Sequence, residues 1–213
     1  MKTFLLIFVF FLVGLALVLG YRYWNQPHTI FRNTTPALTT KFSLEKAPSE
    51  SLQGSIATVS GSVIWLSRTA AKPVKLTSLR SIQQGEELST GSNGQAVIKI
   101  QNDTSLLLLQ NTHVSIIQLL PENFVFVQDK GSVRYENTIQ VPVSVKSFGL
   151  ITLITKGIVT VTVDPKNQKV TVAVVKGIIK EAYEDAQNTS NVLTVNAGQT
   201  FVYDETNKIG SIE

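Results

Sequence analysis

From Ser55 onward, apolar and polar residues alternate with a period of two in a series of short segments. Turn sequences rich in Asn, Gly, Asp and Pro separate these segments every 8–12 residues or so. No stretch after Gly54 keeps a 3.6-residue apolar period. The pattern therefore predicts an all-β fold, either an antiparallel β-sandwich or jelly roll, or a solenoid-like stack. The clearest strand candidates are VIKI (97–100), FVFV (124–127), SVRYE (132–136), VPVSVKS (141–147), IVTVTV (158–163) and KVTVAVV (169–175).

Two local features sharpen this expectation. The segment VTVDPKNQKVTV (161–172) predicts a β-hairpin, because Pro165 presets φ and the Asp164 side chain can cap its own backbone. A glycine followed by an apolar strand recurs at GSVIW (61–65), GSVRY (131–135), GIVTV (157–161) and GIIKE (177–181). Each of these glycines is expected to open a strand where the backbone needs a positive φ or turns tightly.

The N-terminus has a different pattern. Phe4 to Gly20 is 17 residues long without a charged side chain, and as a helix it would span roughly 25 Å. Aromatic residues at 21, 23 and 24 match a headgroup-level belt. We expect a transmembrane signal-anchor over 1–24, a flexible Thr/Pro/Ser-rich linker over 25–53 and a β domain over 54–213. A cleaved signal peptide is the alternative, although its apolar region would be shorter.

Charge and composition exclude several functions. Residues 1–52 carry five Lys or Arg against two Asp or Glu, and the remaining 161 residues carry 14 against 13. A nearly neutral body does not predict nucleic-acid binding, which needs a concentrated basic surface. The absence of cysteine removes disulfides, thiolate metal sites and a cysteine nucleophile.

The loop STGSNG (90–94 with Ser89) has the glycine density of a phosphate site, but it lacks the lysine of a P-loop and precedes a strand. We expect it to be a bend between strands. His113, the one histidine of the body, has no His or carboxylate at ligand spacing, and an outward position next to an inward Val114 is expected. The sequence thus predicts no cofactor, no metal and no catalytic residue.

Two other features are candidate sites. The acidic pairs Glu86-Glu87 and Glu184-Asp185 lie in expected turns, and neighbouring side chains on a strand do not converge. Trp65 and Tyr135 lie in strands, where packing in the core or at its edge is the simpler interpretation. The sharper interpretation makes these two aromatic rings anchors for a protein partner.

Five motifs in order resemble the FecR domain, the periplasmic part of iron-dicitrate-type sensors. They cover about 61–205 and are GSVIWL (61–66), GEELSTGSNGQAVIKIQNDTSLLLLQNTHVSI (85–116), GSVRYE (131–136), KVTVAVVKGIIKEAY (169–183) and LTVNAGQTFVYDE (193–205). Ile158 stands where the family usually has Thr. The resemblance implies an antiparallel β-sandwich of jelly-roll type in the periplasm. Sensors of this family also bind a sigma factor through a cytoplasmic segment; only Met1 to Thr3 precede the apolar span here, so no direct anti-sigma role is expected.

These observations lead to one main hypothesis and two alternatives. The main hypothesis is a non-enzymatic, single-pass protein of the bacterial inner membrane, held in the lipid bilayer by residues 4–20. Its periplasmic FecR-like domain would bind envelope protein partners in signalling or assembly. The first alternative is a lipid-carrying β jelly roll resembling the bridge proteins of lipopolysaccharide transport. A closed core around Leu106–Leu109 and Ile116 would argue against it. The second alternative is an enzyme, which would need a convergent carboxylate pair or a serine–base pair.

Overall fold

The computed structural model describes residues 50–101 and 103–213, so the expected signal-anchor and most of the linker lie outside the described residues. Within those ranges the chain contains fifteen β-strands and no helix, which confirms the all-β prediction. None of the described residues belongs to a helix that could cross a membrane. The strands are β1 (Gly54–Ser60), β2 (Val63–Leu66), β3 (Val74–Lys75), β4 (Ser81–Ile82), β5 (Glu87–Thr90), β6 (Gln95–Ile100), β7 (Thr104–Leu108), β8 (His113–Leu120), β9 (Asn123–Asn137), β10 (Val143–Ser147), β11 (Leu150–Asp164), β12 (Lys169–Glu184), β13 (Ser190–Asn196), β14 (Thr200–Asp204) and β15 (Ile209–Ile212).

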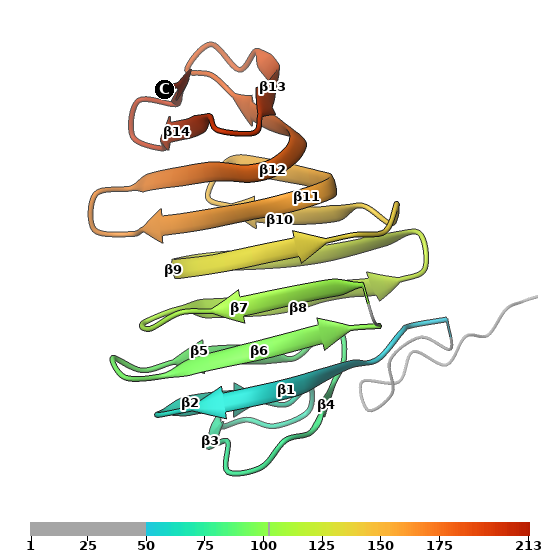
Figure 1. Cartoon of the computed structure of the whole chain (residues 1–213). Helices are drawn as coiled ribbons and strands as arrows, with labels where there is room; N and C mark the ends of the chain where they lie inside the picture. Colours follow the sequence, from blue (N-terminus) through green and yellow to red (C-terminus); the bar gives the residue numbers. More distant parts are fainter. Residues whose placement is uncertain (1–49, 102) are drawn as a thin grey trace, which may run out of the picture. The chain divides into compact units, whose positions relative to one another are not determined.

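The strands stack into two layers, front and back in Figure 1. The first layer has the order β4-β1-β6-β7-β9-β11-β12-β14-β15. The second layer has the order β3-β2-β5-β8-β9-β10-β11-β12-β13. The long strands β9, β11 and β12 belong to both layers, because each one bends and continues in the other layer. Strands close in sequence therefore stay close in space, as in the solenoid-like stack that the sequence left open.

The recurring glycines mark these bends. Gly131 lies in the middle of β9, Gly157 in β11 and Gly177 in β12, while Gly61 joins β1 to β2. All four have a positive φ, which confirms the backbone prediction. The prediction that each one opens a strand holds only for Gly61, because the other three lie inside long strands. A strand that folds over a thin core needs one residue without a side chain at the fold, and glycine supplies it.

We call the two sides of the stack the hairpin rim and the glycine rim. The hairpin rim carries the β11–β12 hairpin, where Asp164 pairs with Lys169 and its carboxylate accepts the backbone N–H groups of Lys166 and Asn167. The glycine rim carries the bends at Gly157 and Gly177, which pair with each other. The hairpin is thus confirmed where the sequence placed it.

One strand pair corrects the expectation of a purely antiparallel sheet. β10 runs parallel to the first half of β9, with Val143 opposite Phe124, and all other pairs are antiparallel among the described strands. The reason lies in the path of the chain. β9 crosses the second layer, bends at Gly131 and returns through the first layer to the glycine rim where it began. The next strand therefore enters the second layer from the same side and runs in the same direction as the first half of β9.

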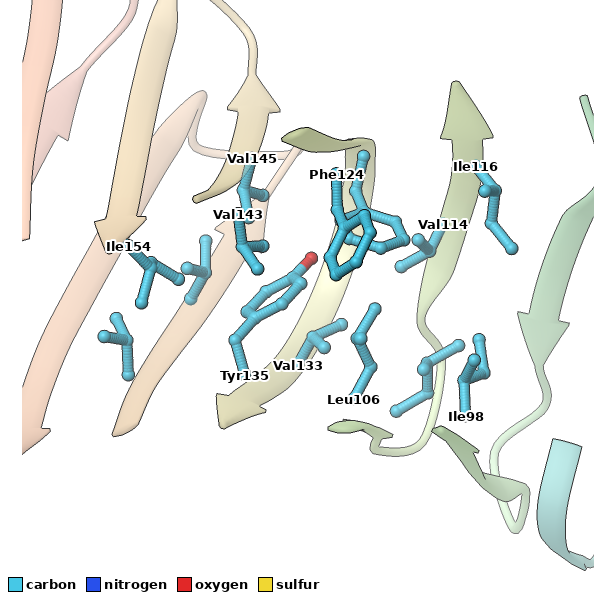
Figure 2. Packing of buried hydrophobic residues seen from close by; sticks show 14 of the residues in the cluster. Ile98, Leu106, Val114, Ile116, Phe124, Val133, Tyr135, Val143, Val145 and Ile154 are labelled. Atoms are coloured by element: carbon cyan, nitrogen blue, oxygen red, sulfur yellow. The ribbon is translucent and has the colours of Figure 1, made fainter. Parts of the chain in front are cut away.

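The core lies between the layers and is filled by the inward side chains of the alternating pattern. In the centre of the stack, Phe124, Val133 and Tyr135 meet residues of β7, β8 and β10 (Figure 2). Leu106, Leu108 and Ile116 have at most 1% of their surface exposed. Leu107 and Leu109 are half-buried and face outward, so inward and outward residues alternate along this segment. The buried side chains of Leu106, Leu108 and Ile116 fill the space between the layers here, which argues against the lipid-carrying alternative.

Candidate functional site

The C-terminal rungs of the stack form a groove at the hairpin rim, which we call the end groove. It has a volume of about 350 Å³ and receives side chains from the β10–β11 turn, from β12 and β13, and from β14 and the residues after it. Residues far apart in sequence meet there only because the rungs stack. The lining residues are Lys146, Phe148, Gly149, Ile151, Ala182, Tyr183, Glu184, Ser190, Asn191, Val192, Tyr203, Glu205 and Lys208.

Phe148, Tyr183 and Tyr203 line the end groove, and the buried ring of Phe201 packs behind them. The ring of Tyr183 lies 6.1 Å from that of Phe201 and 5.2 Å from that of Tyr203, in tilted arrangements. Gly210 permits this packing, since a Cβ there would overlap the Phe201 ring and lie 2.7 Å from Tyr183. Tilted aromatic clusters of this kind hold each ring in one orientation. The wall is therefore a preformed surface.

Polar groups surround this aromatic wall. The Glu205 carboxylate accepts the backbone N–H of Gly149 at 2.8 Å and ties the β10–β11 turn to the residues after β14. Burial, with the Glu205 carboxylate nearby, raises the pKa of Tyr203 to about 12, so its hydroxyl keeps its proton at neutral pH. Lys146, Lys208, Glu184 and Glu205 also line the groove. The mixed charges and aromatic wall suit an uncharged or mixed polypeptide segment better than an anion.

Glu181 is a buried carboxyl close to this groove in sequence and on the same strand as Tyr183. It has no exposed surface and pairs across the sheet with Thr152, whose hydroxyl donates to Glu181 Oε2 at 2.8 Å. Burial raises the pKa of Glu181 to about 8, while the Thr152 hydrogen bond lowers it by less. Its Oε1 and the Oγ of buried Ser147 have no hydrogen-bond partner among the described residues. Glu181 is thus a neutral acid at pH 7 that no substrate can reach.

A second groove lies at the glycine rim, over the paired bends of β11 and β12. Its volume is about 280 Å³. Lys156 and Lys176 flank the space that the two glycines leave open, and Glu136 lies beside them. The Asn137 amide at its base donates to the carbonyl oxygens of Val141, Ile154 and Thr155. This amide nitrogen is therefore used by the backbone, and Lys156, Lys176 and Glu136 are the charged side chains that line the second groove.

The two aromatic residues singled out in the sequence lie in the core. Trp65 is 8% exposed; its Nε1–H donates to Glu86 Oε2 at 3.2 Å, and the Arg80 guanidinium lies 3.4 Å above its ring. Tyr135 is 1% exposed and donates its hydroxyl to Gln128. The geometry favours the packing interpretation of both rings. A role as partner anchor stays a prediction that this placement does not support.

The acidic pair Glu86-Glu87 lies at the start of β5, and the pair Glu184-Asp185 lies at the end of β12. Glu86 points inward to Trp65, while Glu87 on β5 points to the outer face, so the two carboxylates diverge. Asp185 accepts backbone N–H groups from Gln187 and Thr189 and closes a turn, which holds its pKa below the ordinary value. The glycines of STGSNG also form a turn, in which the Gly94 N–H donates to the Gly91 carbonyl.

The stack creates one polar cluster that the sequence did not predict. Strand β8 places His113 beside β5 and β9, so that Ser89 Oγ lies 2.6 Å from His113 Nδ1. His113 Nε2 lies 3.6 Å from Glu87 Oε2 and 3.5 Å from Asp129 Oδ2. The sequence shows no carboxylate at ligand spacing from His113, but the fold brings one hydroxyl and two carboxylates close to its ring. These contacts depend on the β5–β8 and β8–β9 registers, for which the sequence carries no signal.

The position of this cluster on the protein surface limits the reactions that it could catalyse. Hydroxyl, imidazole and carboxylate in series are the groups of a serine-hydrolase triad. However, the cluster lies on the outer face of the second layer, and neither groove described above includes any of its four side chains. In the part of the chain that the structure describes, no group of three or more His, Cys, Asp or Glu could hold a metal ion. His113 otherwise lies as expected, half-buried beside the inward Val114.

Comparisons with known proteins support the fold alone. No protein-family model and no curated protein sequence matches the chain. Two crystal structures, at 2.50 and 1.65 Å resolution, of a protein described as a putative anti-sigma factor from Parabacteroides distasonis ATCC 8503 have a similar fold. The similarity has a TM-score of 0.52 at 12% sequence identity and covers 60% of this chain. It covers 58% of that protein, so this chain matches under two thirds of its length.

Proposed function

We propose that this chain is a FecR-like envelope protein, anchored in the bacterial inner membrane, whose β body binds protein partners and performs no catalysis. Residues 1–24 would be the signal-anchor, 25–53 the linker and 54–213 the periplasmic domain. The single observation that carries the proposal is the similarity of this fold to the two crystal structures described as a putative anti-sigma factor. The five motifs of the sequence, which span most of this stack, add to it.

In this proposal, the protein partner binds in the end groove. Rigid aromatic walls with a polar border are typical of protein-binding surfaces, in which a few aromatic side chains contribute most of the affinity. The groove combines Tyr183 and Phe148 with charges of both signs. A polypeptide partner satisfies such a border more readily than a small anion or a lipid chain does.

Photocrosslinking in cells tests the binding proposal. A photoreactive phenylalanine analogue replaces Phe148, which lines the end groove, in the full-length chain. The expected result is one discrete adduct with another envelope protein, since the analogue keeps the aromatic shape and lies against the bound partner. Leu79, which is 61% exposed and lies in the segment between β3 and β4, is the matched control position and should give no such adduct. Equal labelling from both positions, or none from Phe148, would contradict the proposal.

The location of the domain is tested separately. Protease added to spheroplasts is expected to degrade the β body of the full-length chain while the membrane-held fragment survives, because the body would lie outside the inner membrane. A body that resists protease until the membrane is dissolved would place it in the cytoplasm. A body released into the periplasm without its first residues would show a cleaved signal peptide and exclude the anchor.

A further inference from the structure

The two ends of the stack differ in how far the core is covered. At the N-terminal end, the irregular segment between β2 and β5 folds over the core, with Leu76 6% exposed and Ile82 fully buried. At the C-terminal end, β13 pairs only with β12 and β15 only with β14 among the described strands. Ile212 pairs with the inward Phe201 and is still 40% exposed. The last rung therefore ends in two strand edges over an uncovered part of the core.

The direction of the backbone groups on β13 follows from one hydrogen bond. The backbone N–H of Asn196 donates to the Gln199 side chain at 2.8 Å, so it points away from β12. In an antiparallel ladder, alternate residues point their N–H and C=O groups to the same side. Ser190, Val192 and Thr194 therefore direct these groups to the open edge. Three residues of β13 thus offer their backbone donors and acceptors to the open edge, while the N–H and C=O of Asn196 already bond to Gln199.

This edge lacks the features that keep natural edge strands from pairing. Such strands usually carry a charged residue, especially lysine, or a proline or a bulge. The sequence of β13, SNVLTVN, contains no charge and no proline, and it pairs with β12 over its whole length without a register shift. Val192 is 64% exposed on it. An edge of this kind is suited to receiving another strand.

We propose that the occupant is β13 of a second copy of this chain, paired antiparallel about a two-fold axis at Leu193. This register places edge-facing Val192 opposite edge-facing Thr194, and Ser190 opposite Asn196, whose backbone groups already bond to Gln199. Leu193 meets Leu193, and Asn191 meets Val195. No like charges face each other, and β-branched or aliphatic side chains make up the central pairs, which stabilises a cross-strand contact.

The same register explains why a copy of the chain fits better than an unrelated strand. β13 carries no charge with which to select a heterologous partner, whereas its own sequence is complementary to itself in the antiparallel sense. A two-fold interface also closes after two copies, so the uncharged edge does not lead to filaments. The pairing continues the second layer from one body into the next, and it uses Ser190 and Val192, which also line the end groove.

A single cysteine tests this register. The chain contains no cysteine, so Leu193→Cys introduces one thiol per copy. Residues opposite each other in a non-hydrogen-bonded antiparallel pair have Cα atoms about 4.5 Å apart, which a disulfide can bridge. Mild oxidation of the full-length variant in detergent is expected to give a disulfide-linked dimer on a non-reducing gel. Val175→Cys, at a 53% exposed position on β12, is the matched control and should stay monomeric.

A second variant tests the backbone contact without a new bond. Thr194→Pro removes an N–H that faces the open edge, so the bonds to β12 remain. The dimer dissociation constant, measured by sedimentation of the full-length chain in detergent, is expected to rise on the order of tenfold or more. If circular dichroism shows that this variant does not fold, Thr194→Lys blocks the same edge. A folded Leu193→Cys variant that forms no dimer, that crosslinks no better than Val175→Cys, or that captures only a different protein would overturn the proposal.

Discussion

Substituting Gly177 with alanine is expected to lower the free energy of unfolding by roughly 4 kcal/mol. Gly177 has a φ of +91°, where a side chain is strained. A Cβ at this position would overlap the carbonyl oxygen of Lys156 and lie 2.9 Å from the Gly157 Cα. The paired bends of β11 and β12 hold this backbone in place, so neither strand can give way without opening the glycine rim. Urea denaturation of the full-length chain in detergent, followed by circular dichroism, measures the loss.

Gly198 supplies the matched control. It has nearly the same backbone conformation, with a φ of +86°, but no atom lies within 4 Å of the Cβ that alanine would add. Gly198→Ala should therefore cost only the backbone strain, about 1–2 kcal/mol. The difference between the two variants isolates the close approach of the two bends. Equal losses would show that the bends tolerate a side chain and that the glycines reflect φ alone.

Replacing Glu181 with glutamine is expected to remove a pH dependence from the stability of the body. Burial raises the pKa of Glu181 to about 8, against an ordinary value of 4.5 in the unfolded chain. Between these values the folded state holds a proton that the unfolded state has released, so the stability falls as pH rises. The fall is up to about 1.4 kcal/mol per pH unit, or on the order of 4 kcal/mol from pH 5 to pH 8. Glutamine has a similar shape and no proton to lose.

The measurement is the difference between wild type and Glu181→Gln across pH 5 to 8, because that difference cancels the titration of other groups. The turn carboxylates Asp164, Asp185 and Asp204 titrate below this window, since hydrogen bonds from backbone N–H groups lower their pKa values. Glu184→Gln changes an exposed carboxyl on the same strand and should leave the slope unaltered. Parallel curves for wild type and Glu181→Gln would mean that Glu181 is ionised in the folded protein.

The local elements of this fold could be predicted from the sequence because their causes are local. The alternation of apolar and polar residues places strands at 97–100 and 169–175, and Asp164-Pro165 fixes the hairpin. The glycines of the recurring G-x-hydrophobic pattern take a positive φ as expected. The outward position of His113 beside Val114 follows from the same alternation. A period of two is a property of the strand itself, and it holds whatever the strand pairs with.

The tertiary structure decided everything that depends on which strand lies beside which. It joined 124–127 and 132–136 into one bent strand, and it made β10 parallel to β9. It brought Ser89, Glu87 and Asp129 to His113, buried Glu181 beside Thr152, and left β13 as an open edge. A shift of one residue in any of these registers would turn each side chain to the opposite face. The register is set by long-range packing of the two layers, so the sequence determined the strands and turns, while the stack alone determined their neighbours.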